Sequence, residues 1–139
     1  MLFAARLILR QNEGHEHRRS CVETVELCRT GEWMGAVNTL YADDIVSVKP
    51  RAMGEMPAEM HGLEAVRGKT EWFLDAHEVH GSKVSNPFVA RDTFVVQFEI
   101  DVTNKASNER MQMSEVGIYT VKNGKVVREE FLPQAKSEG

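Results

Sequence analysis

The chain has 139 residues, of which 42% are hydrophobic and 27% are charged. These are the fractions of an ordinary globular protein, and the length suits one hydrophobic core rather than two. Seventeen lysines and arginines against 21 aspartates and glutamates give a net charge of −4, the wrong sign for a protein that holds a phosphate backbone. Nucleic acid is therefore not expected as a ligand.

The first 19 residues are predicted to be an extension outside the folded domain, and residues 134–139 a C-terminal tail. Arg6 interrupts the apolar residues near the start and no small-residue cleavage site follows, which argues against a secretory signal and leaves an organelle-type presequence open. His15 and His17 lie in a charged segment where solvated side chains are the usual case, so no metal is expected there.

Membrane insertion and disulfide bonding are not expected either. No apolar run approaches the roughly 18 residues that a membrane span requires. Cys21 and Cys28 lie on one predicted helix, about 10 Å apart along its axis, which is too far for a disulfide bond. Two free cysteines fit a reducing compartment, and we expect a cytoplasmic protein.

Three helices are predicted. Ser20 and Glu23 have the spacing of a capping box, which begins a helix over roughly 20–30 that ends at Gly31. A second, short helix follows to about Tyr41, where two aspartates end it. The third covers residues 62–77, whose apolar side chains recur at helical spacing.

Strands occupy most of the remaining chain. A short strand is predicted at 45–48, and residues 50–61, which show no periodicity, are predicted to be a loop. Four further strands are expected at 79–90, 93–104, 109–122 and 125–132. Asn123 and Gly124 between the last two are typical of a tight hairpin turn. This order describes an α+β domain in which helices pack on one face of an antiparallel sheet.

Three segments in this order resemble the SnoaL-like proteins: residues 40–44, His61 with Gly62, and residues 124–128. That family belongs to the nuclear-transport-factor-two-like superfamily, which includes ketosteroid isomerases. The resemblance covers about residues 20–133 and implies a cystatin-like roll, in which a cone-shaped, curved antiparallel sheet wraps around three helices and leaves an apolar pocket. It also implies a homodimer formed through the sheet. Because this fold carries both enzymes and binding modules, function must be argued from the pocket.

The catalytic positions of the isomerases are not kept in this sequence. Where the isomerases carry their proton-shuttling carboxylate, this chain has Lys49 followed by Pro50. The acid of their oxyanion hole corresponds to Gly117, and their tyrosine falls near Thr24 or Val25. Steroid isomerisation by that mechanism is therefore excluded.

Other ionisable groups are predicted to face the pocket. Strand alternation and the family pattern together place Glu115, Tyr119, Glu129 and Lys49 inward, with further inward positions at Met111, Met113, Gly117, Val121, Val127, Phe131, Ile45 and Ser47. Charges in an apolar cavity are costly unless they are paired or neutralised. We therefore expect Glu129 and Glu115 to transfer protons with Lys49 as their electrostatic partner, or all three to form an ion-pair network that only fixes strand register.

The sequence-based hypothesis is a pocket for a small hydrophobic molecule, with cofactor-independent acid–base catalysis of the cyclase, isomerase or hydrolase kind. The alternative is a binding or dimerisation module without turnover. No metal or cofactor is expected, because His77 and His80 straddle a helix end and lack the one-face spacing of a zinc helix. The residues expected to contact the ligand are Trp72, Phe73, Met111, Met113, Tyr119, Phe131 and His61.

Overall fold

The computed structural model describes residues 21–52 and 55–133, so the predicted N-terminal extension and C-terminal tail, with Ser20, His15 and His17, lie outside the described residues. A helix covers residues 21–29. The other elements are α2 (Trp33–Leu40), β1 (Tyr41–Val48), β2 (Glu59–His61), α3 (Leu63–Ala76), β3 (His77–Val84), β4 (Phe88–Ala90), β5 (Thr93–Asn104), β6 (Glu109–Lys122) and β7 (Lys125–Pro133).

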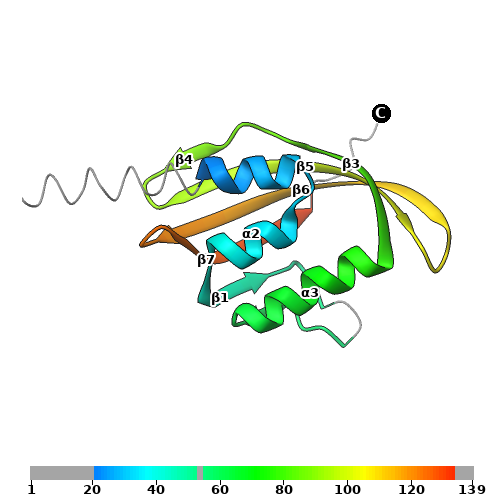
Figure 1. Cartoon of the computed structure of the whole chain (residues 1–139), viewed down its shortest axis with the longest axis horizontal. Coiled ribbons are helices and arrows are strands. Elements are labelled where there is room, and N and C mark those ends of the chain that lie inside the picture. Colours follow the sequence, from blue (N-terminus) through cyan, green and yellow to red (C-terminus); the bar gives the residue numbers. More distant parts are fainter. Residues whose placement is uncertain (1–20, 53–54, 134–139) are drawn as a thin grey trace, which may run out of the picture.

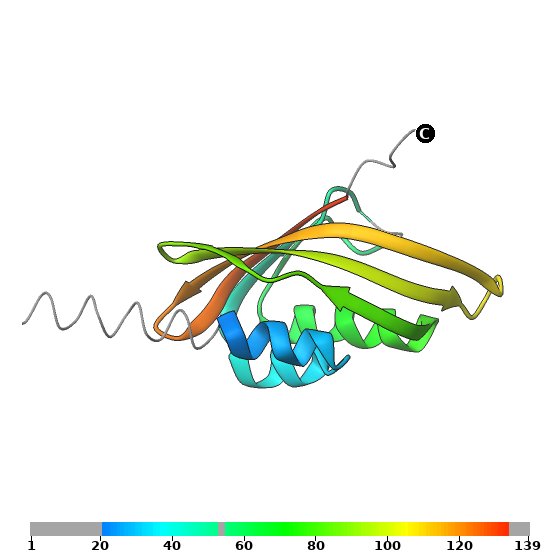
Figure 2. The same ribbon diagram turned by 90° about the horizontal axis from the view of Figure 1, so that it is seen from above.

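One curved sheet contains all seven strands, and the three helices lie on the same side of it (Figures 1 and 2). The order across the sheet is β2-β1-β7-β6-β5-β3, and the short strand β4 pairs with β5. The predicted α+β architecture is confirmed, with one refinement. The sheet is mixed, because β1 runs parallel to β7 while every other pair is antiparallel.

The core lies between the helices and the concave face of the sheet. The predicted alternation of β5 is confirmed, since Phe94, Val96, Phe98, Ile100 and Val102 are all buried. The hairpin turn between β6 and β7 is also confirmed, because Asn123 and Gly124 both have positive φ, at 53° and 75°. Among the described residues, no helix is long and apolar enough to cross a bilayer.

Several predicted boundaries were wrong where sheet pairing overrides local preference. The predicted strand 79–90 is two strands, β3 and β4, separated by a segment that contains Pro87, which has no N–H for a ladder. The predicted loop contains β2, which pairs with β1 through Val46 and His61. Asp43 and Asp44 do not end a helix: both lie exposed within β1, which already begins at Tyr41.

The predicted inward orientation of Val127 was also wrong. Val127 was expected to face the core, but the buried residue is its neighbour Val126, which is fully inaccessible to solvent. The pairing changes from Thr120 with Arg128 to Val121 with Val126, so Val127 is an extra residue in β7. A bulge of this kind moves the alternation by one position.

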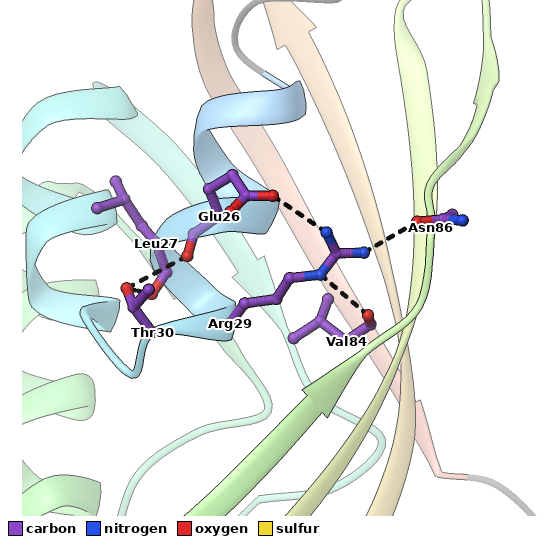
Figure 3. Close-up of polar contacts among 6 residues, drawn as sticks. All are labelled: Glu26, Leu27, Arg29, Thr30, Val84 and Asn86. Atoms are coloured by element: carbon purple, nitrogen blue, oxygen red, sulfur yellow. Dashed lines mark hydrogen bonds and ion pairs between the residues drawn. The ribbon is translucent and has the colours of Figure 1, made fainter.

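An arginine fastens the first helix to the sheet (Figure 3). The Arg29 Nε donates to the carbonyl oxygen of Val84 at 3.2 Å, and its Nη2 donates to Asn86 Oδ1 at 3.0 Å. Nη1 of the same guanidinium donates to Glu26 at 3.0 Å within the helix. These hydrogen bonds attach the first helix to the end of β3. The helix thereby forms one wall of the space between the helices and the concave face of the sheet.

Candidate functional site

A pocket of about 110 Å³ lies between the three helices and the concave face of the sheet. Its walls are mainly apolar and aromatic, with residues such as Trp33, Val37, Phe73, Phe98, Ile100 and Phe131. Four charged side chains also line it: Lys49, Lys69, Glu115 and Glu129. Water-excluding walls with a few polar groups are typical of small-molecule sites.

Glu129 lies at the centre of a buried polar network. Its Oε1 accepts hydrogen bonds from Ser47 Oγ and Lys69 Nζ, both at 2.8 Å, and its Oε2 accepts one from the Tyr41 hydroxyl. Lys69 Nζ also donates to Ser47 Oγ at 2.8 Å. Glu129 is only 2% exposed and Lys69 only 9%. Both oxygens of the carboxylate are therefore engaged by donors of the protein itself.

The sheet register and one helix face bring these groups together. Ser47 on β1 is paired with Glu129 on β7, and Glu129 is paired on its other side with Tyr119 on β6. On α3, Lys69 follows the fully buried Val66 by three residues, which places it on the face that packs against the sheet. A lysine thus occupies a core position of the helix.

The two tyrosines near Glu129 are kept in their neutral form. Burial, and to a smaller extent the negative charge of Glu129, raise the pKa of Tyr41 well above its usual value. Burial raises the pKa of Tyr119 in the same direction. Both hydroxyls therefore keep their protons, and Tyr41 acts as a hydrogen-bond donor to Glu129.

Lys49 and Glu115 are the two charged residues of the pocket that lie outside this network. Both line the pocket, but within the described part of the chain neither side chain makes a hydrogen bond or an ion pair. Burial, opposed by the charges of Lys49 and Lys69, raises the pKa of Glu115. Burial and the neighbouring charge of Lys69 lower the pKa of Lys49. A carboxyl group with a raised pKa and free oxygens can exchange a proton with a bound molecule.

The family model of the SnoaL-like domain matches residues 21–132 of this chain, most of its length. The chain belongs to the SnoaL-like family. A solved structure from Mesorhizobium loti is similar to this SnoaL-like domain at 44% sequence identity and a TM-score of 0.76. It is described as a SnoaL-like polyketide cyclase, with carbohydrate phosphatase given beside it. That similarity covers 83% of this chain and 97% of the other.

More distant solved structures show the same fold. TerC, crystallised with polyporic acid, has 15% identity and a TM-score of 0.65, covering 86% of this chain and 92% of that one. A protein from Xanthomonas campestris with a cystatin-like fold has 10% identity and a TM-score of 0.68, with the same coverage. The expected cystatin-like roll is therefore confirmed. No curated protein shows significant similarity to the chain.

The structure brings most of the predicted site residues of the SnoaL-like domain to one pocket. They are Lys49, Trp72, Phe73, Met113, Glu115, Tyr119, Glu129 and Phe131. Met111 does not line it and packs, half-buried, against the hydrophobic core. His61 does not line it either: it lies exposed on β2, where its Nε2 is 3.0 Å from Glu59 Oε1.

Sequence reasoning missed two residues that bond to Glu129, Lys69 and Tyr41. The helical spacing of Lys69 from Val66 is a signal that could have placed this lysine on the buried face of α3. Tyr41 was assigned to a helix end, so its side chain could not be placed in the sheet.

Gly117 explains why the oxyanion-hole acid of the isomerases has no counterpart here. A Cβ atom at this position would lie 2.8 Å from Phe98 Cε2 and 2.9 Å from Tyr119 Cε2. Both rings are buried and pack edge to face. No side chain fits at residue 117 of the SnoaL-like domain without displacing them.

The ring nitrogens of His77 and His80 contact other groups of the protein. His77 Nδ1 lies 2.9 Å from the carbonyl oxygen of Phe73, and its ring stacks on the Phe73 ring at 4.4 Å. His80 Nε2 lies 2.7 Å from Thr103 Oγ1. Within residues 21–52 and 55–133, no group of His, Cys, Asp and Glu side chains is arranged to hold a metal ion.

Glu115 is expected to make the stability of the SnoaL-like domain depend on pH. Its pKa in the folded state is raised above the ordinary value of 4.5, so the folded state retains this proton to higher pH than the unfolded state. The corresponding stabilisation is fully present below about pH 4.5 and is lost as pH rises through the folded-state pKa. Glu115→Gln removes this titration, so the unfolding free energy of the variant should rise relative to the wild type from pH 4.5 to 8.

Urea unfolding of both proteins at several pH values measures this difference. Glu99→Gln is the matched control, because Glu99 lies on the neighbouring strand β5 at a position that alternates with the buried ones. Parallel pH profiles for the wild type and Glu115→Gln would contradict the prediction.

Proposed function

We propose that the protein binds a small hydrophobic molecule in its pocket and catalyses proton transfer on it without a cofactor, in a reaction of the cyclase or isomerase kind. Glu115 is the proton-transferring group, and Lys49 supplies positive charge beside the substrate oxygen. The volume of about 110 Å³ is close to that of a cavity that encloses one benzene ring, roughly 150 Å³. Larger molecules would extend through the open side of the pocket.

One observation carries the proposal: Glu115 is a carboxyl group in an apolar pocket whose oxygens are not engaged by any described residue. Burial also brings its pKa closer to neutrality, where a general acid or base works best. Glu129 does not meet this requirement, since three donors already occupy its oxygens. We therefore assign Glu129 to positioning Tyr41 and Lys69.

Two relatives support the class of reaction and ligand. The Mesorhizobium loti protein, at 44% identity, is described as a SnoaL-like polyketide cyclase, with carbohydrate phosphatase given beside it, and the first of these descriptions agrees with the proposal. TerC was crystallised with polyporic acid, an organic small molecule, although its 15% identity shows the fold alone. Both agree with an organic ligand in the pocket.

Proton transfer can be tested without knowing the natural substrate. 2-Tetralone is an aromatic ketone whose α-protons exchange with deuterium in D₂O when a base removes them, and proton NMR follows the loss of the signal. We expect the wild-type protein to accelerate this exchange above the rate in buffer. Exchange at the buffer rate, from a protein that binds 2-tetralone, would refute catalysis by proton transfer.

The second candidate is a binding module without turnover. The engagement of Glu129 by its neighbours favours it, since the network is complete without a substrate. Such a module would be stabilised by its ligands in a thermal-shift measurement yet would leave exchange at the buffer rate. The exchange assay therefore separates the two candidates.

We also propose that the protein is a cytoplasmic homodimer formed through the sheet. Val116 and Leu132 are paired across β6 and β7 on the side away from the helices, and Leu132 is 43% exposed. Cys21 and Cys28 are free thiols, as a reducing compartment favours. Light scattering on the purified protein tests the dimer, and a monomeric mass would exclude it.

A further inference from the structure

Two lysine ammonium groups lie beside the same aromatic ring in the pocket. Lys49 Nζ is 5.4 Å and Lys69 Nζ is 5.3 Å from the centre of the Phe131 ring. Their partners differ, because Lys69 is bonded to Glu129 and Ser47 at 2.8 Å, whereas the Lys49 side chain has no hydrogen bond or ion pair within the described part of the chain. Among the described residues, Lys49 is therefore the cation of the pocket that has no counter-ion in contact.

Only one lysine of the pocket is in contact with a carboxylate among the described residues. Lys69 and Glu129 neutralise each other by direct contact. Glu115 is the other acidic residue of the pocket, but it makes no ion pair with Lys49. Among the described residues, no anion is therefore in direct contact with the ammonium group of Lys49.

An ammonium group in such surroundings is stabilised by an anion in contact with it. Leaving it without one is costly, because the low local dielectric weakens its solvation. The lowered pKa of Lys49, caused first by burial and then by Lys69, shows this cost. A ligand that brings its own negative charge would remove it and gain a charge-assisted hydrogen bond.

We infer that the pocket selects hydrophobic molecules that carry a carboxylate, and that Lys49 is the residue that binds this carboxylate. The ring of such a molecule would pack against the aromatic walls, which include Phe73 and Phe131. This inference rests on the proposed function, since it names the substrate class of the same pocket. It also gives Lys49 a binding role that does not depend on turnover.

The test compares two probes of the same shape, 2-naphthoate and its neutral amide, 2-naphthamide, by isothermal titration calorimetry. We expect the wild type to bind the carboxylate about 10- to 100-fold more tightly than the amide, the range expected for one hydrogen bond to a charged group. Lys49→Met should abolish this preference, because it weakens the binding of the carboxylate far more than that of the amide.

Two control variants complete the design. Lys49→Arg keeps the charge and should retain a preference for the carboxylate, which also guards against a folding defect in Lys49→Met. Lys83→Met removes an exposed lysine of β3 outside the pocket and should bind both probes as the wild type does.

Each outcome decides between the proposals. Equal affinities of the wild type for the two probes, or a preference that survives in Lys49→Met, would overturn the carboxylate inference alone. Failure of both probes to bind would overturn the pocket hypothesis and with it the proposed function. A Lys49-dependent preference without exchange of 2-tetralone protons would support carboxylate binding and refute proton-transfer catalysis.

Discussion

Glu115→Gln is expected to slow the protein-catalysed exchange of 2-tetralone α-protons by about 100-fold or more, because general acid–base catalysis by one side chain contributes typically 10² to 10⁴ in rate. The amide is nearly the same size as the carboxyl group but cannot take up a proton at neutral pH. Burial raises the pKa of Glu115, which makes its carboxylate a stronger base than a solvated glutamate. The initial rate of deuterium incorporation, measured by NMR, gives the ratio between the two proteins.

Two comparisons show whether the loss is specific. Glu99→Gln makes the same substitution on β5, outside the pocket, and should exchange at the wild-type rate. Thermal-shift titration should show that Glu115→Gln still binds 2-tetralone, since the aromatic walls are unchanged. An exchange rate in Glu115→Gln equal to that of the wild type would remove Glu115 from the mechanism.

Lys69→Met should lower the free energy of unfolding by about 3–5 kcal/mol, the usual cost of removing one partner of a buried ion pair. Lys69 is 9% exposed and Glu129 2%, so the carboxylate left behind could not be solvated by water in place of the ammonium. Ser47 and Tyr41 would still donate to Glu129, but neither carries a charge. Urea unfolding at pH 7 measures the loss.

A double-mutant cycle distinguishes this electrostatic cost from lost packing. In Lys69→Met/Glu129→Leu both charges are absent, so the double variant should be more stable than the sum of the two single changes predicts. Lys83→Met, which removes an exposed lysine, should change stability by less than about 0.5 kcal/mol. Additive losses in the cycle would show that Lys69 and Glu129 do not stabilise each other.

The three charged residues predicted for the pocket differ in their contacts. Glu129 belongs to a network of buried donors that connects β1, β7 and α3, as a register-fixing ion pair requires. Glu115 and Lys49 remain without contacts of this kind among the described residues and face the same cavity. The ion-pair partner of Glu129 is Lys69, which was not predicted to line the pocket.

The α+β class follows from local patterns, whereas the inward positions of Glu115, Glu129 and Phe131 were predicted from strand alternation together with the resemblance to the family. Alternation over β5 and β6 is long enough to assign a face to each residue, and the Asn123–Gly124 turn sets the start of the final hairpin. Such signals act between neighbours in the chain, so they can be recognised without any knowledge of what packs against them.

By itself, the sequence determined the class of fold and the strand alternation that places Glu115 and Tyr119 on one face of β6. Only the tertiary structure decided that Lys69 neutralises Glu129, that Tyr41 belongs to a strand, and that a bulge buries Val126 instead of Val127. The reason is that these features depend on pairing between segments far apart in the chain, such as Lys69 and Glu129, 60 positions apart. Local periodicity carries no information about such pairing.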